Sequence, residues 1–324
     1  MILVTGGTGH IGNVLVRRLI QAGRKVRVLA LPDESRRSLQ DVEVEFVTGD
    51  ILDSSSCRQA MAGVDVVYHL AGVIAISPGH EKRMWEVNVV GARCAAEAAA
   101  AMGVRRFIHV GSVHALARSR GQVVDESASL ALSAPPDNYD RTKAEGVATA
   151  LAMAETGLEV VVVCPSGIIG PYDFGGSEMG RLVCNLARPG WHVLVDGGFD
   201  FVDVRDVAAG LMLAAEKGSN REIYILSGTY VSLVELHQLV RSVAKTKSAS
   251  LVVPTSLALT IGKIMPYYYR LTGSTPQITT YSVRTVIEKC RFSSAKARRE
   301  LGYKPRSLAH TIRETLGWWR NMAE

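Results

Sequence analysis

Three glycines follow the first apolar segment of the chain, with the spacing Gly6-x-x-Gly9-x-x-Gly12. Residues 2–5 before them read as a buried parallel strand, and the apolar positions in residues 11–22 recur at helical spacing. Glycines at such a turn permit unusual backbone angles and let the backbone approach a pyrophosphate, which binds at the N-terminus of the helix. The motif therefore predicts a nucleotide-binding α/β fold with cofactor contacts at Gly6, Gly9, His10, Ile11 and Gly12.

Apolar strands and amphipathic helices alternate through the first half of the chain. We expect strands at residues 25–31, 42–48, 64–71, 106–111 and 158–164, and helices at residues 54–61, 82–102 and 139–156. This alternation predicts a Rossmann-type doubly wound parallel sheet with right-handed crossovers. After residue 165 the pattern loosens into loops that contain Gly and Pro. We therefore expect a dinucleotide-binding domain in residues 1–165 and, in residues 166–324, mainly a smaller C-terminal substrate-binding region folded back onto it.

Composition narrows the class of protein. The 324 residues are 47% hydrophobic and 21% charged, which suits a globular protein rather than a disordered one. The net charge is +6, but Lys and Arg are scattered except at residues 105–106 and 296–299, so we expect no nucleic-acid partner. We interpret the surplus as an aid to binding a phosphorylated cofactor.

The five cysteines are dispersed, odd in number and without metal-ligand spacing, so we expect neither a metal site nor disulfides. Residues 1–5 lack a basic leader and a cleavage site, and we expect a cytoplasmic protein. No apolar run reaches the ~18 residues of a membrane-spanning helix. The nearest, residues 251–269, is interrupted by Pro254, Lys263 and Pro266. We interpret it as a covered pocket wall, with a hydrophobic lid or an interfacial helix as alternatives.

The end of the second expected strand bears on the choice of cofactor. An acidic side chain there favours NAD, whereas Arg favours NADP. Residues 30–37 place no carboxylate at the strand end itself, and Arg36 and Arg37 follow shortly afterwards. We therefore prefer NADP over NAD, with Arg36 or Arg37 as the phosphate contact. The alternative is that both are solvated loop residues and that Asp33 binds the ribose of NAD.

Further cofactor contacts are expected after the third and fourth strands. We assign Asp50 and Ile51 to the adenine side, while Asp53 has the position of a helix N-cap. Leu70, Ala71 and Gly72 follow the fourth strand, where small residues let the backbone pass close to the cofactor. We interpret His69 as a packed strand residue.

A serine at a strand end and a Tyr–Lys pair carry the expected chemistry. Ser112 follows the strand at residues 106–111, at the edge where chemistry occurs in such folds, and a serine hydroxyl there can bind a substrate oxygen. Tyr139 and Lys143 share one face of a helix, where the ammonium should lower the phenol pKa. We predict that Ser112, Tyr139 and Lys143 are catalytic and that the last two also bind the cofactor. His114 is a weaker choice for lining the pocket, and Asn88 orders either the active site or only local structure.

With these motifs together, the chain resembles an extended short-chain dehydrogenase/reductase over nearly its whole length. Residues 164–171 resemble the family's loop after the sixth strand, residues 201–208 its later motif, and residues 292–305 its C-terminal segment. The resemblance implies that Tyr139 donates the proton, that Lys143 binds the nicotinamide ribose and that Ser112 orients the substrate. It also implies backbone contacts to nicotinamide at Pro165 and Ile168.

The same resemblance implies a homodimer built on the helices that hold Asn88 and Lys143, with Ala95, Ala96, Ala98 and Ala99 on the faces that would suit it. The apolar loop at residues 74–77 and residues 261–273 are more similar to the dihydroflavonol reductase and 3β-hydroxysteroid dehydrogenase branch than to the nucleotide-sugar epimerases. We therefore expect hydride transfer between NAD(P)H and a ketone, aldehyde or secondary alcohol on a largely apolar small molecule. An epimerase or dehydratase with retained NAD, its diphosphate held by Arg181, Arg188, Arg205 and Arg284, and a non-catalytic dinucleotide sensor remain alternatives.

Overall fold

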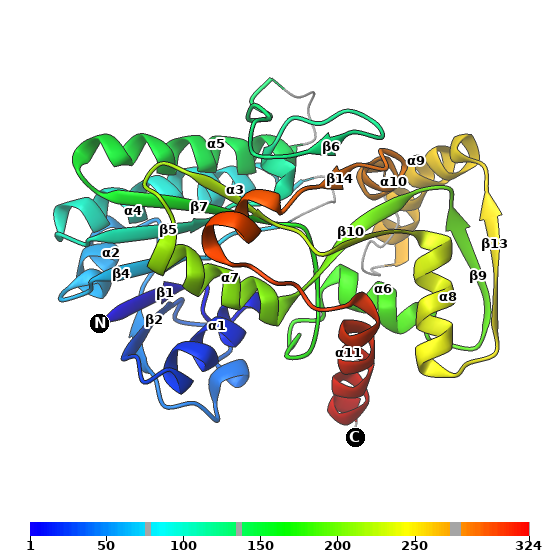
Figure 1. Ribbon diagram of the computed structural model, residues 1–324, viewed down its shortest axis with the longest axis horizontal. Coiled ribbons are helices and arrows are strands. Elements are labelled where there is room, and N and C mark those ends of the chain that lie inside the picture. The colour runs from blue at the N-terminus through cyan, green and yellow to red at the C-terminus, as the bar shows by residue number, and fades with distance from the viewer. Residues whose placement is uncertain (75–78, 134–137, 273–279, 324) are drawn as a thin grey trace.

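The computed structural model describes residues 1–74, 79–133, 138–272 and 280–323, and Figure 1 shows their arrangement. Within these residues, the main sheet has seven parallel strands in the order β11-β7-β5-β4-β1-β2-β3. Their bounds are β1 Ile2–Thr5, β2 Val26–Ala30, β3 Glu45–Thr48, β4 Val66–His69, β5 Arg106–Val110, β7 Glu159–Pro165 and β11 Ile223–Leu226. The predicted doubly wound sheet is confirmed, and each predicted strand overlaps an observed one.

Helices cover both faces of this sheet because its strands are apolar on both sides. One face packs against α2 (Ser54–Met61), α4 (Ala92–Ala101) and α5 (Asn138–Ala152), and the other against α1 (His10–Gln21) and α7 (Val204–Lys217). Neighbouring residues of one strand therefore enter opposite cores. Leu3 packs in the first core and Val4 in the second. The helix predicted at residues 82–102 comprises α3 (Glu81–Trp85), a π-helical stretch at Glu86–Gly91 and α4.

The C-terminal half contributes to the main sheet as well as forming a smaller layer. From it, α7 packs on α1, and β11 forms the sheet edge beside β7. The smaller layer has its own apolar core. Its elements are β8 Gly167–Ile169, α6 Glu178–Leu186, β9 Gly190–Val195, β10 Gly198–Asp203, β12 Thr229–Ser232, α8 Leu233–Ala244, β13 Ser248–Val253, α9 Thr255–Thr272, α10 Thr280–Ile287 and α11 Leu308–Ala323.

Two short strands connect the two halves of the chain, since β14 (Arg291–Phe292) pairs with β6 (Val123–Val124). The boundary predicted between residues 165 and 166 stays a prediction. Within the described residues, no helix combines the length and the apolar content needed to cross a bilayer.

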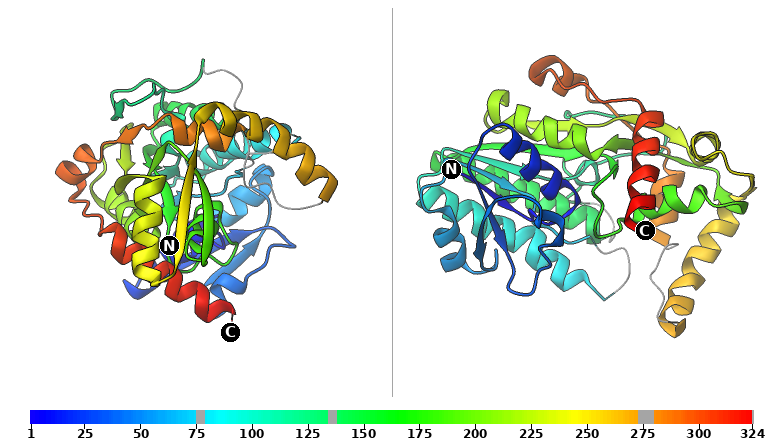
Figure 2. Two further views of the ribbon diagram at one scale, coloured as in Figure 1. Left: turned by 90° about the vertical axis from the view of Figure 1, so that its right-hand side faces the viewer. Right: turned by 90° about the horizontal axis from the view of Figure 1, so that it is seen from below.

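One expectation for the C-terminal half is wrong. The stretch interpreted as a covered pocket wall forms the end of β13 and the start of α9, and its apolar side chains Leu251, Leu257 and Ile264 are exposed. Nothing of the described structure packs over them, because α9 projects from the body of the molecule (Figure 2).

Candidate active site

The glycine turn joins β1 to α1 and leaves the start of the helix open. Gly6 has a φ of +67°, in the region that favours glycine, and a Cβ there would lie 2.7 Å from the backbone nitrogen of Ala71. A Cβ on Gly12 would lie 2.1 Å from the carbonyl oxygen of Gly6. Gly9 is the N-cap and supplies no side-chain cap to α1. The first N–H groups of α1 are therefore available to an anion.

His10, at the first position of α1, points its side chain away from that helix end. Its Nε2 atom hydrogen-bonds the carbonyl oxygen of Pro171 at 3.0 Å, and burial lowers the pKa of its imidazole. The Asn13 amide donates to the carbonyl oxygen of Tyr172 at 3.1 Å. These two contacts hold the segment after β8 against the glycine turn.

The end of β2 carries a carboxylate that sequence reasoning did not consider. Glu34 accepts hydrogen bonds from the Thr8 hydroxyl, within the glycine motif, and from the backbone N–H of Leu31 at 2.9 Å. The guanidinium of Arg36 lies over the Phe46 ring, 4.5 Å from its centroid, and donates to the Thr48 hydroxyl at 3.2 Å. An acidic and a basic group therefore flank the place where the adenosine ribose is bound in this fold.

After β3, Asp50 accepts the backbone N–H of Leu52 at 2.9 Å. The side chain of Ile51 is buried in the first core, so only its backbone faces outward. Asp53 caps α2 by accepting the N–H groups of Ser55 and Ser56, which confirms its predicted role.

The end of β4 lies beside the turn. The backbone N–H of Ala71 donates to the Thr5 hydroxyl at 3.3 Å, Leu70 and Ala71 are half-buried and Gly72 is exposed. A Cβ on Gly72 would lie 3.1 Å from Asn88 Oδ1 and 3.2 Å from Lys143 Nζ. The small residues predicted here therefore leave room directly in front of Lys143.

His69 is a packed strand residue, as predicted. Its Nδ1 lies 2.9 Å from the Thr5 hydroxyl, and its ring stacks on those of Phe107 and His109. Burial and then the charge of Lys143 lower the pKa of His69 to about 3, so it is neutral at physiological pH.

Asn88 holds the chain that follows Gly72. Its amide accepts from the N–H of Val73 at 2.8 Å, donates to the Val73 carbonyl at 2.9 Å and donates to the Thr142 hydroxyl at 3.2 Å. Gly146 lets α5 approach this residue, since a Cβ there would lie 2.4 Å from the Asn88 carbonyl oxygen. Asn88 thus positions the segment beside the site, and its location in a π-helical stretch is typical of functional helices.

The three predicted catalytic residues meet at the carboxyl edge of the sheet. Ser112, two residues after the end of β5, accepts the backbone N–H of His114 at 3.2 Å, and its hydroxyl lies near enough to the Tyr139 phenol to lower the pKa of that group. Tyr139 lies in the first turn of α5, and Lys143 lies one turn later. Among the described residues, no hydrogen bond or ion pair holds the Lys143 ammonium.

The expected pKa shift of Tyr139 is wrong in sign. Burial raises the pKa of the phenol, the charges of Asp140 and Glu178 raise it further, and the nearby Ser112 hydroxyl opposes them. Lys143 is half-buried, and the loss of solvent around its ammonium lowers its pKa to about 8. Desolvation penalises both charged forms and outweighs their attraction across one helical turn. The phenol is therefore protonated at neutral pH.

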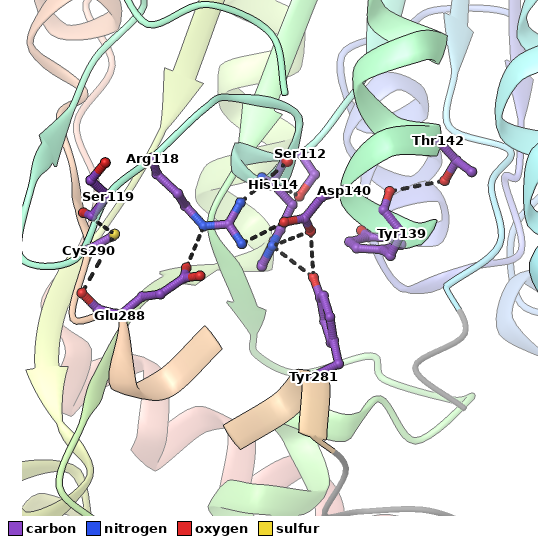
Figure 3. A network of polar contacts seen from close by, with 10 residues as sticks. All are labelled: Ser112, His114, Arg118, Ser119, Tyr139, Asp140, Thr142, Tyr281, Glu288 and Cys290. Atoms are coloured by element: carbon purple, nitrogen blue, oxygen red, sulfur yellow. Dashed lines mark hydrogen bonds and ion pairs between the residues drawn. The ribbon is translucent and has the colours of Figure 1, made fainter. Parts of the chain in front are cut away.

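A polar network that sequence reasoning missed lies on the other side of Tyr139 (Figure 3). Asp140 is 3.0 Å from His114 Nδ1 and accepts from Tyr281, in α10, at 2.7 Å and from Arg118 at 2.7 Å. Arg118 also donates to Glu288 at 2.7 Å. Burial alone would raise the pKa of Asp140, but His114, Arg118 and Tyr281 lower it to about 2.

Aromatic rings surround the Tyr139 phenol from the same side. The His114 and Tyr281 rings each meet the Tyr139 ring edge-on. The distances between ring centroids are 5.6 Å for His114 and 6.2 Å for Tyr281. His114 also stacks on Phe199, from β10, at 5.9 Å. The C-terminal half thus contributes two rings to the site. The sequence signals for this network were His114, predicted as a weaker choice for lining the pocket, and the adjacency of Asp140 to Tyr139.

Pro165 ends β7 beside Ser112 and is buried, while Ile168 in β8 is half-buried. Arg205, one of the four arginines considered for a sugar diphosphate, is held by Asp203 at 2.8 Å. Residues 75–77 of the apolar loop at residues 74–77 lie outside the described residues.

The residues present fit a dinucleotide. The open helix end and the glycine turn, which a Cβ would fill, suit a pyrophosphate. The space in front of Gly72, next to Lys143, would take the nicotinamide end of the cofactor. A family model described as "NAD dependent epimerase/dehydratase family" matches residues 2–227. The chain belongs to this family. The predicted resemblance to extended short-chain dehydrogenases/reductases is thereby confirmed, and the chain is an NAD(P)-dependent oxidoreductase of this type.

Proteins that are similar to this chain over its full length carry different names. "Sterol demethylase protein B" of Methylococcus capsulatus is 33% identical, covering 98% of both chains. A "putative dihydroflavonol 4-reductase" of Synechocystis is 28% identical, covering 98% of this chain and 94% of its own. The crystal structure of gox2253 superposes with a TM-score of 0.86 at 30% identity, covering 99% of this chain and 98% of that one.

The alanines expected at a dimer interface are not available for one. Ala95, Ala96, Ala98 and Ala99 are buried in the first core of the same chain, since this face of α4 packs toward α2 and the sheet. That part of the dimer argument is wrong, and the homodimer stays a prediction.

Proposed function

We propose that this protein catalyses reversible hydride transfer between a nicotinamide cofactor and a ketone, aldehyde or secondary alcohol on a largely apolar small molecule. The observation that carries the proposal is that Ser112, just after the end of β5, and Tyr139 and Lys143, one turn apart in α5, come together at the carboxyl edge of the sheet beside the glycine turn and Gly72. The names of the full-length relatives, which refer to sterols and dihydroflavonols, support an apolar substrate. The rings of Phe199 and Tyr281 near Tyr139 support it too.

The chain's own residues account for binding and proton transfer. A substrate oxygen placed between Ser112 and Tyr139 would accept a hydrogen bond from each, which stabilises the alkoxide-like charge of the transition state. Tyr139, protonated at neutral pH, donates its proton to this oxygen in reduction and recovers it in oxidation. Lys143 would bind the nicotinamide ribose in the space before Gly72. The bound nicotinamide would supply or accept the hydride at C4.

We further propose that NAD is the preferred cofactor. The sequence prediction of NADP relied on Arg36 and did not consider Glu34. The Glu34 carboxylate is held by Thr8 and Leu31 after the end of β2, where it can accept hydrogen bonds from the ribose hydroxyls and would repel a 2′-phosphate.

Five free cysteines suit a reducing compartment, which supports a cytoplasmic location.

The variant Tyr139→Phe tests the reaction. Removing the hydroxyl should lower kcat about 10²-fold or more with 3-ketosteroids or dihydroflavonols, because no other group donates the proton. Cofactor affinity, measured by fluorescence titration, should stay within about twofold, since Phe retains the ring. Tyr230→Phe, in β12, is the matched control and should keep the full rate. A Tyr139→Phe enzyme that reduces carbonyls at the wild-type rate contradicts the mechanism.

A further inference from the structure

The charge surplus of the chain is concentrated in one segment. Between Glu235 and Glu288 the sequence has no Asp or Glu, but it has six of the 37 Lys and Arg. The remaining Lys and Arg therefore equal the 31 Asp and Glu in number, and the rest of the chain carries no formal net charge. The Lys and Arg themselves are scattered, and it is the absence of Asp and Glu that places the surplus in this segment.

Strand β13 of this segment pairs with β9, from outside it, in a small sheet that exposes apolar side chains. Strands β9 and β13 are parallel and in register, so Trp191 with Ala249 and Val193 with Leu251 share one face. Trp191 is 77% and Val193 65% exposed on this face. The opposite face is buried, since Leu194 packs in the C-terminal core. The outward face of β9 and β13 is therefore a bare apolar surface.

Helix α9 extends this surface. Leu257 and Ile264 lie two turns apart on one side of the helix, and Ile264 is 60% exposed. Figure 2 shows β9, β13 and α9 at one end of the molecule, and Figure 1 shows the N-terminus at the opposite end. We call this end the distal surface, defined by the exposed side chains of Trp191, Val193, Leu251, Leu257 and Ile264.

Basic side chains border the distal surface. Lys245 and Lys247 are exposed immediately before β13, and Lys263 is exposed beside Ile264. Across the described ranges, none of the three forms an ion pair. The acidic residue next to β9, Asp196, is already paired with Lys289. Exposed apolar groups with a Trp, bordered by unpaired cations, are the pattern of a surface that lies at the interface of an anionic bilayer.

We propose that the distal surface binds the protein reversibly to anionic lipid bilayers. Trp191, Leu257 and Ile264 enter the headgroup boundary, and Lys245, Lys247 and Lys263 lie among the lipid phosphates. A second copy of the chain would bury the apolar groups equally well. It would place the lysines of both copies at one interface without acidic partners, so charge complementarity favours lipid.

Vesicle flotation of the full chain tests this proposal without any need for turnover. Wild type should bind vesicles of roughly one-third phosphatidylglycerol in phosphatidylcholine, bind pure phosphatidylcholine far less, and be released by high salt. The double variant Lys245→Glu/Lys247→Glu should weaken binding about 25-fold or more, at about fivefold for each Lys lost. Its control is Arg24→Glu/Lys25→Glu, at the opposite end, which should bind as wild type.

A separate variant tests whether the exposed apolar side chains contribute to vesicle binding. Ile264→Glu should abolish flotation, whereas Met102→Glu, which changes an exposed apolar residue at the end of α4, should not. Thermal unfolding checks that each variant is folded. The proposal is overturned if wild type ignores anionic vesicles, or if Ile264→Glu binds them normally. It is also overturned if sedimentation shows a dimer that Ile264→Glu dissociates while no vesicle binding occurs. Each of these results leaves the proposed reaction untouched.

Discussion

At the scale of single residues, burial decides the charge state of the site. Tyr139 and Lys143 have the spacing that sequence analysis requires of a catalytic pair, yet the sequence cannot show how much solvent each loses. The fold removes solvent from both, so desolvation raises the pKa of the phenol and lowers that of the ammonium. That the proposed catalytic residues lie together was predictable because it follows from order and spacing, but their pKa values depend on tertiary packing.

Lys143 should lower the free energy of unfolding, although the proposed reaction requires it. Its pKa in the folded state, about 8, is below the value of 10.5 for the free group, so the unfolded chain binds more protons between these pH values. Burial of the ammonium therefore destabilises the fold below pH 8, and this cost fades as the pH rises toward 10.5. Lys143→Met should raise the free energy of unfolding at pH 7 by about 2–3 kcal/mol and abolish turnover.

Urea unfolding at about pH 7 and about pH 10 measures this effect, with the gain expected to shrink at the higher pH. Lys82→Met is the control, because that side chain is 90% exposed and should change stability little. A Lys143→Met protein that is less stable than wild type at pH 7 contradicts a burial cost.

Glu34 and Arg36 favour different cofactors at the adenosine ribose, because a carboxylate there favours NAD and an Arg favours NADP. Glu34→Gln removes the charge that repels a 2′-phosphate and keeps the shape, so it should shift the ratio of NAD to NADP affinity about tenfold toward NADP. Asp33→Asn, at the exposed residue beside it, should shift the ratio much less. If Glu34→Gln leaves the ratio unchanged and Arg36→Met abolishes NADP binding, the original NADP prediction is correct and our proposal is not.

At the scale of elements, local patterns located the strands and helices of the nucleotide half closely. The helix predicted at residues 54–61 is α2 exactly as observed, since Asp53 gives it a clear N-cap. The C-terminal half was not predicted in the same way. Helix α10 reaches the site through Tyr281, and nothing in its own sequence indicates a partner in α5 that lies more than one hundred residues earlier.

The contact between α10 and α5 should matter for substrate binding more than for cofactor binding. Tyr281→Phe keeps the ring beside Tyr139 but removes the hydrogen bond to Asp140. Unfolding free energy should fall by about 1–2 kcal/mol, and KM for the carbonyl substrate should rise while the NAD dissociation constant stays unchanged. Equal effects on both ligands would mean that α10 supports the whole fold and not the substrate side of the site.

At the scale of the whole molecule, a dinucleotide half and a smaller half meet at the catalytic edge of the sheet. The first supplies the glycine turn, Ser112, Tyr139 and Lys143, and the second supplies Phe199 and Tyr281. The family fold was predictable because the βα pattern repeats. The distal surface was not, because exposure and the joint placement of β9, β13 and α9 are products of the finished fold.

The central claim is that the protein makes a net transfer of hydride between the cofactor and the substrate, so that the cofactor is consumed in each turnover. The most direct measurement uses NADH that carries deuterium at both positions of C4 of the nicotinamide, mixed with the protein and a 3-ketosteroid or dihydroflavonol, followed by mass spectrometry of the product. We predict deuterium on the carbinol carbon of the alcohol, in an amount equal to the NADH oxidised. An unlabelled product, or a nucleotide sugar that is epimerised while added NADH is not consumed, would contradict the account.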